Sequence, residues 1–574
     1  MYMRIRTTNT KSGRLFYVIK TYYDANGKEH SLTVEKLGNE HVIQEKYNCD
    51  PDTWAKEYVK KLNEQEKQRK RKVLVPFEEN KIIDKDLHSS FNGGYLFLQS
   101  IYHKLGLHKI CKNIETRHNF DFNLDSILSR LIYSRIMFPA SKRATFELSE
   151  KYLEQPDFEE HQIYRALSVL ADESDFIQEQ LYKNSLKTFG RKNKVIYYDC
   201  TNFFFEIEQP DVEGLRKYGI SKEHRPNPIV QMGLFMDADG IPLAFDINPG
   251  NTNEQITMRP LEKKLLSNFG LSKFVVCTDA GLASYANRKY NTFSGRSFIT
   301  TQPIKKMKNF LMEWVLDSKD WSLKGSDKTY DISNLDDKND EDKIFYKERW
   351  INEDGLEQKL IVTYSLKYKK YQEKIRNGQI ERAEKLIKSN PTKVKRKGNN
   401  DYRRFISEQK CTDDGEVAEN NIFGIDMEQI NYEKKFDGFY AVCTDIEDDT
   451  EGVVQINQRR WEIEECFRIM KSEFKSRPVY LQRSDRIKAH FMTCFISLIL
   501  YRFLEKTIDE KYTCSTLIKT LKDMNFYQIP GEGYIPTYTR TDVTDTLHDA
   551  FGFRTDYQIM SNSQMKKIFK DTKN

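Results

Sequence analysis

The spacing of apolar residues separates a β-rich start, a helical stretch and a longer strand-rich part of the chain. Residues 1–45 alternate as strands do, and Asn26-Gly27 between two β-rich runs is typical of a hairpin. Residues 87–190 instead repeat apolar positions with the period of a helix. The sequence therefore predicts a small β module followed by a compact helical domain.

Buried strands are predicted again from residue 194 onward. The apolar runs are KVIYYD (194–199), IVQMGLFM (229–236), IPLAFDI (241–247) and KFVVCTDAG (273–281). Asp239-Gly240 lies between the second and third runs and predicts another hairpin. Residues 258–269 have helical spacing. This order of strand, hairpin, helix and strand predicts a mixed α/β sheet.

Three later segments depart from this rhythm. Residues 302–435 interrupt it and are predicted to form an inserted domain. Residues 451–475 predict one long amphipathic helix. The apolar run 491–500 has about half the length needed to cross a bilayer, so it predicts a buried helix.

The charge of the chain is nearly balanced but unevenly distributed. The 92 basic and 86 acidic residues give a net charge of +6, which excludes a uniformly basic, histone-like protein. Within the predicted insertion, 313–342 is strongly acidic and 364–404 is strongly basic. The basic stretch fits either a surface that follows DNA or a solvated pair of helices.

Two smaller basic clusters also have two interpretations. KQRKRK (67–72) fits a solvated linker or a phosphate-contacting segment. Arg130, Arg135, Lys142 and Arg143 lie near the break at 139–141 and fit either phosphate contacts or an ordinary solvated face.

Length and cysteine usage narrow the class of protein. A chain of 574 residues predicts three or four domains. Nine cysteines without a CxxC pair or zinc-finger spacing predict reduced, mostly buried thiols. The N-terminus lacks the apolar core of a signal peptide. We expect a soluble cytoplasmic protein that has no membrane partner.

Two aspartates carry the first candidate chemistry. Asp199 and Asp279 each follow a predicted buried strand, and ligands gather at the carboxyl ends of strands in open α/β sheets. Neighbouring carboxylates repel each other unless a cation neutralises them, and their hard oxygens suit Mg²⁺ or Mn²⁺. The alternative is that each aspartate only caps the next helix or turn.

The predicted helix that contains RRWEIEECFRIMKSEFK (459–475) supplies a third acid. At about 100° per residue, Arg460, Glu464, Phe467 and Lys471 fall on one helix face, whereas Glu462 and Glu465 point away. A carboxylate between two cations suits binding of metal and phosphate, but a surface ion-pair network would have the same pattern.

These motifs together resemble DDE-type insertion-sequence transposases, in particular the subgroup with the signature Y-x2-R-x3-E-x6-K. Arg460, Glu464 and Lys471 match three of its four positions, and Asn457 stands at the tyrosine position. YYDCTNFFFE, GIPLAFDINPGNTNE and CTDAG resemble the motifs of the first acid, the intervening segment and the second acid. The similarity runs from about residue 90 to about 505.

The resemblance implies an α/β fold with a ribonuclease-H-like catalytic core, interrupted by an insertion and preceded by a small β module and a helical DNA-binding domain. The implied parts are a β module with basic linker (1–75), the helical DNA-binding domain (76–190), the core (191–301 and 436–510), the insertion domain (302–435) and a C-terminal segment (511–574).

The resemblance also implies a mechanism. Asp199 would bridge two Mg²⁺ or Mn²⁺ ions, and Asp279 and Glu464 would each complete one site, for cleavage of element ends and their joining to target DNA. Arg460 and Lys471 would hold the phosphate near a flipped base during excision through a DNA hairpin. Asn457 cannot stack as tyrosine does. Trp461 could replace that surface or pack in the core.

The implied partners are double-stranded DNA with terminal inverted repeats, target DNA and a second copy of the chain in a synaptic complex. Two alternatives remain open. One is another ribonuclease-H-like nuclease, such as a junction resolvase or exonuclease. The other is a catalytically silent DNA-binding protein descended from a transposase, which Asn457 keeps possible.

Overall fold

The computed structural model describes the chain except residues 1–2, 11–12, 24–28, 69–72, 74–78, 81, 86, 390–400, 412–416 and 448–449. The chain divides into two compact units, Met1–Lys85 and Asp86–Asn574.

The first unit is a three-stranded antiparallel sheet with two helices. Its elements are β1 (Met3–Thr10), β2 (Gly13–Tyr23), β3 (Glu29–Asn39), α1 (Glu40–Tyr47) and α2 (Pro51–Gln68). Tyr23 pairs with Glu29, so two antiparallel strands flank Asn26-Gly27 as expected, although that turn lies outside the described residues. Most of the KQRKRK stretch also lies outside them. The helices were not predicted, and they cover the core around Phe16 and Val18.

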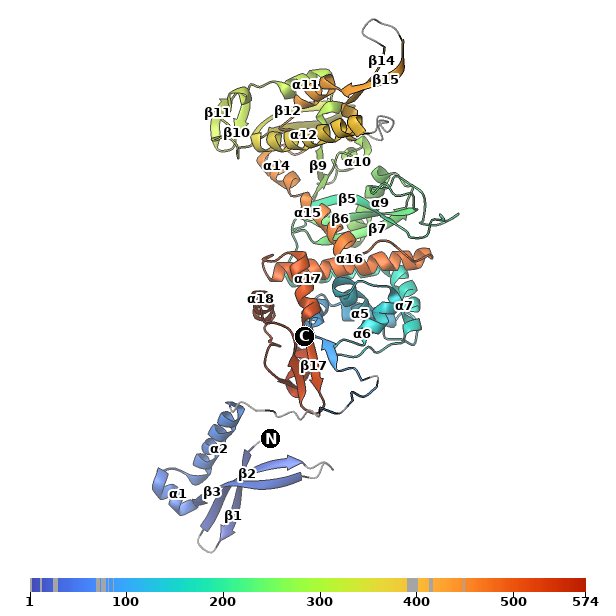
Figure 1. Ribbon diagram of the computed structural model, residues 1–574. Helices are drawn as coiled ribbons and strands as arrows, with labels where there is room; N and C mark the ends of the chain where they lie inside the picture. Colours follow the sequence, from blue (N-terminus) through green and yellow to red (C-terminus); the bar gives the residue numbers. More distant parts are fainter. Residues whose placement is uncertain are drawn as a thin grey trace. The chain divides into compact units, whose positions relative to one another are not determined.

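The second unit begins with the expected helices. They are α3 (Tyr95–Lys104), α4 (Leu107–Glu115), α5 (Leu124–Met137), α6 (Lys142–Ser149), α7 (Glu160–Asp172) and α8 (Ser174–Phe189). A later helix, α16 (Ser484–Thr507), packs against α3, α5 and α7 on one side and β7 on the other (Figure 1). It is long and apolar enough to span a membrane by length and composition alone, but 94% of its apolar window is buried inside the protein. It is therefore the central core helix, and much longer than its ten-residue apolar run.

A mixed sheet of ten described strands forms the rest of the core. In spatial order the strands are β11 (Ser326–Tyr330), β10 (Trp321–Leu323), β12 (Phe345–Glu353), β13 (Leu356–Tyr364), β16 (Phe439–Thr444), β9 (Ser297–Thr301), β8 (Val275–Thr278), β5 (Val195–Phe204), β6 (Ile229–Asp237) and β7 (Pro242–Pro249). The pairs β5–β8 and β8–β9 are parallel, and the other pairs are antiparallel. α9 (Glu254–Asn268) packs on β6 and β7.

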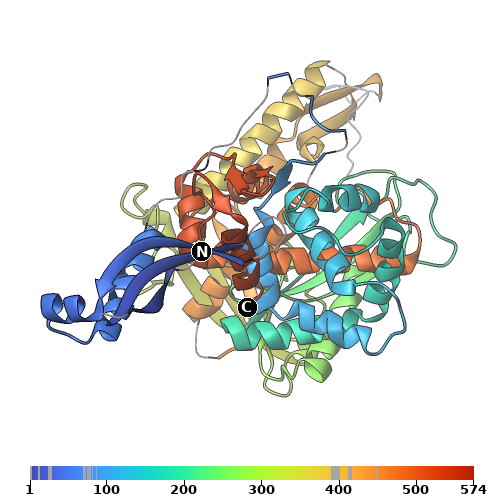
Figure 2. The same ribbon diagram turned by 90° about the horizontal axis from the view of Figure 1, so that it is seen from below.

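The first strands of the segment 302–435 join this sheet. Strand β13 pairs with β16 from Lys359↔Thr444 to Tyr364↔Phe439, so β10–β13 extend the same sheet. This pairing covers a sheet edge that β16 would otherwise expose. Beyond it lie α12 (Leu366–Ser389), the hairpin β14 (Ile406–Cys411) and β15 (Val417–Ile425), and α13 (Met427–Lys434), with α12 beside β15 (Figure 2).

The acidic and basic stretches of this segment partly neutralise each other. Lys367 lies 3.1 Å from Asp342, and Lys370 lies 2.9 Å from Glu341. Arg376 forms a buried ion pair with Asp437 at 2.6 Å, which fixes α12 to the sheet. The described part of the basic stretch is one helix and a short 3₁₀ turn, and residues 390–400 lie outside the described chain.

The prediction of one continuous helix over 451–475 is wrong. α14 (Thr450–Gln458) and α15 (Trp461–Arg468) are separated at Arg459-Arg460, and residues Ile469–Glu473 form a π-helical turn. The break moves Glu462 into the interior, where it lies 2.8 Å from Arg459 and 3.3 Å from Arg502. Burial of a charged side chain in ion pairs therefore overrides the helical pattern here.

The C-terminal residues return to the start of this unit. α17 (Cys514–Asp523) and α18 (Asp542–Phe551) pack near α5 and α3, and α19 (Asn562–Asp571) ends the chain. The strands β19 (Met560–Ser561), β18 (Gly533–Pro536) and β17 (Asn525–Ile529) form a sheet with β4 (Ser90–Asn92). Seven of the eight cysteines that can be described are buried, and all eight are free thiols, as expected.

The predicted hairpin between β6 and β7 is held by a fully buried ion pair. Asp237 Oδ1 accepts hydrogen bonds from the amides of Asp239 and Ile241, and its other oxygen contacts Arg191. Arg191 also donates to Ser185 Oγ at 2.9 Å and to the carbonyl of Ile241 at 2.8 Å. The pair therefore ties the end of α8 to the β6–β7 turn.

We expect Asp237→Ala to lower the free energy of unfolding by about 3–5 kcal/mol, because it leaves a buried guanidinium unpaired. Urea unfolding followed by circular dichroism measures this change. Asp239→Ala, in the same turn, removes only an exposed pair with Lys192 and should cost less than about 1 kcal/mol. Equal losses in the two variants would contradict the role given to Arg191.

Candidate active site

Strand register brings the two predicted aspartates opposite each other. β5 and β8 pair in parallel with Ile196 opposite Val276 and Tyr197 opposite Cys277. Two residues further on, the same register places Asp199 beside Asp279. Asp199 lies within β5, which continues to Phe204, and not at the strand end that the sequence predicted. Asp279 directly follows the last residue of β8, as expected.

The electrostatic surroundings of Asp199 favour a cation. Burial raises the pKa of the Asp199 carboxyl to about 6, and the charge of Asp279 adds to this, against the effect of Lys222. Asp279 Oδ1 accepts the amide of Leu282 at 3.1 Å, so this aspartate does cap a turn. The cap and the pairing coexist, because Asp279 still raises the pKa of Asp199.

Glu464 is paired with Arg460, a side chain that lies in the field of both aspartates. Its side chain is 62% exposed, and its Oε1 lies 3.4 Å from Arg460 Nη2. Arg460 also donates to Thr301 Oγ1 at 3.1 Å. Although burial opposes it, the charges of Tyr440, Asp279 and Asp199 raise the pKa of Arg460. Arg460 therefore experiences the field of both aspartates while it binds Glu464.

The three carboxylates are not yet at metal-binding distances from one another. Among the residues the structure describes, they are not a group whose ligand atoms all lie within 4.8 Å. The exposed Glu464 side chain would have to leave Arg460 and turn toward the aspartates to complete such a site.

Lys471 approaches Asp199 from the π-helical turn. Its Nζ donates to Thr201 Oγ1 of β5 at 2.5 Å. Burial lowers the pKa of Lys471 to about 8, and Lys222 contributes to this, against the attraction of Asp199. Wide π-helical turns recur at functional sites, where they redirect single side chains. The segment 459–475 is therefore not a regular helix. Even so, Arg460 contacts β9, which pairs with β8, and Lys471 contacts β5, which carries Asp199.

Sequence reasoning missed one charged group beside Asp199, the ammonium group of Lys222. Lys222 lies 3.2 Å from Glu254, and despite burial the charges of Asp199 and Glu254 raise the pKa of Lys222. Lys222 lies between β5 and β6, where no periodic pattern indicates its position. Glu254 lies in the GNTNE motif, whose Asn253 caps α9 by accepting the Gln255 amide at 3.0 Å. The motif thus supplies both a helix cap and an ion-pair partner.

A cavity of about 570 Å³ adjoins Arg460 and Glu464. Its walls include four aromatic side chains: Tyr368, Tyr371, Tyr440 and Trp461. Trp461 is 60% exposed, so the interpretation that it packs in the core is wrong. Aromatic faces beside a charged site suit stacking of flat, partly polar groups such as nucleobases.

Asn457 has a specific role in this wall. Its side-chain amide donates to the hydroxyl of Tyr440 at 3.0 Å, and that hydroxyl also lies 2.7 Å from Thr301 Oγ1. A tyrosine therefore does lie beside the position at which the resemblance expects one, but β16 supplies it.

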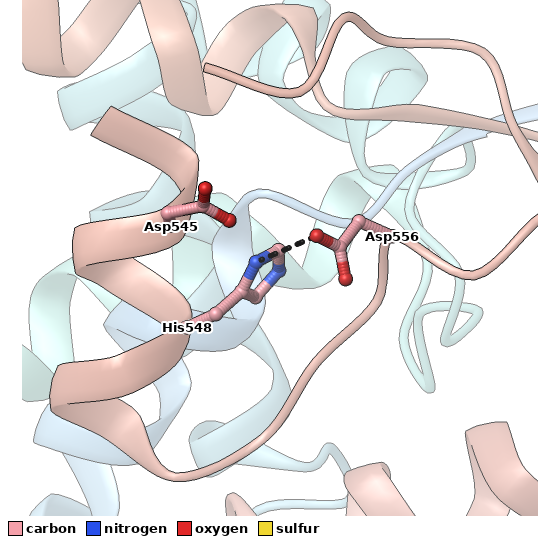
Figure 3. Close-up of side chains that lie close together, drawn as sticks. All are labelled: Asp545, His548 and Asp556. Atoms are coloured by element: carbon pink, nitrogen blue, oxygen red, sulfur yellow. Dashed lines mark ion pairs between the residues drawn. The ribbon is translucent and has the colours of Figure 1, made fainter. Parts of the chain in front are cut away.

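A separate acidic cluster lies near the C-terminus (Figure 3). Asp545, His548 and Asp556 place one possible ligand atom each within 4.8 Å of one another, with 3.7 Å between His548 Nδ1 and Asp556 Oδ2. Arg554 contacts Asp545 at 2.5 Å and Asp556 at 2.7 Å, and Arg540 lies 2.8 Å from Asp545. Since two arginines already neutralise both carboxylates, this is an ion-pair network and not a metal site.

Comparison with known proteins identifies the family. Residues 205–500 match the model described as the transposase DDE domain, which is more than half of the chain. The chain belongs to this family. The match to the DDE domain includes Asp279 and Glu464 and begins six residues after Asp199. The Tyr-Arg-Glu-Lys subgroup is not shown by this match.

No curated protein matches the chain. Among solved structures, the cryo-EM structure of the piggyBac transposase synaptic complex with hairpin DNA is similar, with a TM-score of 0.34 and 8% identity. The similarity covers 83% of this chain and 84% of that one.

The raised pKa of Asp199 predicts a pH-dependent cost of stability in metal-free protein. Because the folded-state pKa is about 6 against an ordinary value of 3.8, the stability contributed by protonated Asp199 is complete below about pH 4 and is lost as pH rises through about 6. We expect the free energy of unfolding of Asp199→Asn to exceed that of wild type by about 1–3 kcal/mol at pH 7.5, and the two values to be equal near pH 4. Urea unfolding at both pH values measures the difference. A constant difference across pH would contradict this origin.

Proposed function

We propose that this DDE-domain protein is a DNA transposase that cleaves the ends of an insertion sequence and joins them to target DNA. The observation that carries the proposal is the register of β5 and β8, which sets Asp199 beside Asp279, with Arg460 near both and Glu464 paired with Arg460. Carboxylates beside basic side chains suit a reaction at a phosphodiester, because both the metal and the phosphate then have partners.

The residues present fit divalent ions. Asp199 and Asp279 offer hard oxygen ligands, and burial, to which the charge of Asp279 adds, raises the pKa of Asp199 and makes its charged form costly without a cation. We infer that Asp199, Asp279 and Glu464 hold two Mg²⁺ or Mn²⁺ ions. Held by these carboxylates, the ions would supply activation of the attacking water or DNA 3′-hydroxyl and stabilisation of the leaving oxygen.

The ion pair between Arg460 and Glu464 couples DNA binding to assembly of the site. A phosphate competes well for a guanidinium, because it accepts two parallel hydrogen bonds. When a phosphate of the DNA backbone binds the Arg460 guanidinium, Glu464 loses its ion-pair partner. Its side chain can then turn toward Asp199 and Asp279. Lys471, already on Thr201, binds the same backbone from the other side. The acid needed for the reaction is therefore released by the substrate.

The finer assignments follow from the resemblance and from the cavity. DNA with terminal inverted repeats and target DNA are the proposed substrates, bound by two copies of the chain in a synaptic complex. The aromatic cavity gives a flipped base a place to stack, with Tyr440 and Trp461 in the role that Asn457 cannot fill. This supports excision through a DNA hairpin.

The catalytic proposal is tested with single charge-removing variants. Asp199→Asn, Asp279→Asn and Glu464→Gln should each reduce Mg²⁺-dependent cleavage of DNA carrying the element ends by at least about 10³-fold, because each removes a ligand or transition-state charge worth several kcal/mol. DNA binding without metal should remain. Gel-resolved cleavage of end-labelled DNA measures both nicking and strand joining.

Glu465→Gln is the matched control, because Glu465 lies on the same helix and contacts only a surface partner, Arg468, at 2.6 Å in the described chain. Glu462 is unsuitable, since it is buried between Arg459 and Arg502 and its loss would disturb the fold. Normal cleavage by Asp199→Asn would remove that residue from the site. DNA binding by wild type without any cleavage would favour the catalytically silent alternative. Cleavage of branched DNA without strand joining would favour a nuclease.

A further inference from the structure

A second cavity, of about 670 Å³, lies away from the catalytic carboxylates. Its walls come from the turn between α5 and α6, from residues 475–483 and from the first turns of α16. None of the lining residues is acidic, and six are arginine or lysine. These are Arg135, Lys142, Lys475, Arg477, Arg483 and Arg486. We call this the basic cleft.

Within the described chain, acids neutralise only two of the six cations. Arg477 contacts Glu223, and Arg483 lies 2.6 Å from Asp485. Arg135 donates to the carbonyls of Phe474 at 3.1 Å and Ala140 at 3.2 Å, which leaves its charge uncompensated. Because four of the six cations have no acidic partner in the described chain, the cavity is electropositive and attracts anions.

The buried side chain of Lys142 is the strongest evidence that the cleft binds an anion. It is 6% exposed, and its Nζ has no hydrogen-bond partner among the described residues. Burial and the charge of Arg135 lower its pKa to about 7. A buried ammonium group without a partner destabilises the folded chain, so its presence indicates that something else binds there.

The neighbouring groups do not supply the missing charge. His490 is buried at the cleft, and burial together with Arg135 and Lys142 lowers its pKa well below the usual value, so it stays neutral. Arg486 stacks over Tyr164 at 5.1 Å, and its Nε also lacks a partner in the described chain. Three basic groups with an unsatisfied nitrogen, on Arg135, Lys142 and Arg486, therefore converge from the three helices α5, α6 and α16.

We propose that the basic cleft binds a phosphodiester of the DNA backbone, at a second contact outside the catalytic centre. The choice of DNA as the ligand rests on the proposed function. The expectation that the cleft binds a phosphate group rests only on the basic residues that line it. The chain connects the two places: Lys471 contacts Thr201 in the site, and Arg477 six residues later lines the cleft. Glu223 lies 4.0 Å from Lys471 and also contacts Arg477, so one shared ion-pair partner joins the edge of the site to the edge of the cleft.

Salt dependence of DNA affinity tests the cleft directly. Removing one cation that binds a phosphate should lower the slope of log affinity against log salt by about 0.9. We expect Lys142→Met and Arg486→Gln each to lower it by about that amount, and the double variant by about twice as much. Fluorescence anisotropy with duplex DNA between about 50 and 200 mM salt gives the slopes. Lys187→Gln, an exposed lysine on α8 outside the cleft, should leave the slope unchanged.

A second readout separates binding from folding. Lys142→Met removes an unpaired buried charge, so its melting temperature without DNA should equal or exceed that of wild type. A lower melting temperature with an unchanged slope would show a purely structural lysine and overturn the proposal. Arg486→Gln tests the cleft independently, since its guanidinium does not pair with an acid in the described chain.

The outcomes distinguish this inference from the proposed function. Unchanged slopes in both variants, with wild-type cleavage of DNA, overturn the cleft and leave the transposase. Reduced slopes in a protein that cleaves no DNA support the cleft and overturn the catalytic proposal. If inorganic phosphate raises the melting temperature of wild type but not of Lys142→Met, and the DNA slopes are equal, the cleft binds a small phosphate and not the backbone.

Discussion

Asp199 and Asp279 are fixed opposite each other because they continue two parallel strands that pair in register, and burial of Asp199, with the repulsion from Asp279 added to it, makes its negative charge costly. A rigid sheet cannot relax by moving one strand away. The protein instead places Lys222, Lys471 and Arg460 around the pair, each on a different element. These cations are themselves shared with Glu254, Thr201 and Glu464, so they only partly offset the repulsion. The remaining deficit of positive charge is what a divalent ion would supply.

The charged clusters of this protein differ in whether neighbouring side chains neutralise them. We interpret neutralised clusters as structural and the others as functional. Asp545, His548 and Asp556 look like metal ligands by distance, but Arg540 and Arg554 already balance them (Figure 3). Arg191 and Asp237 are likewise a closed pair. In the basic cleft four of the six cations have no acidic partner in the described chain, and at the aspartates the uncompensated charge is negative. The positive charge of the basic cleft suits the DNA phosphate backbone, and the negative charge of the aspartates suits metal ions.

Local pattern was enough to predict the strands that carry Asp199 and Asp279, the hairpin at Asp237–Ile241 and the helices before residue 190. It also predicted Arg460, Glu464 and Lys471 on one helix face, but the break at Arg459-Arg460 and the π-helical turn replace that regular helix. The pairing of strands that are distant in the sequence could not be predicted from local pattern. Nothing in β13 indicates that β16, about 80 residues later, is its neighbour. The charges of Arg135 and Arg486 likewise converge only when α16 passes α5.

A structure of the protein with Mn²⁺ and DNA carrying an element end, with manganese located by its anomalous scattering, tests the central claim most directly. Our account predicts manganese between Asp199 and Asp279, with Glu464 turned away from Arg460 onto the metal and Arg460 on a DNA phosphate. Manganese absent from the two aspartates, or Glu464 still bound to Arg460 while the DNA end occupies the site, would contradict it.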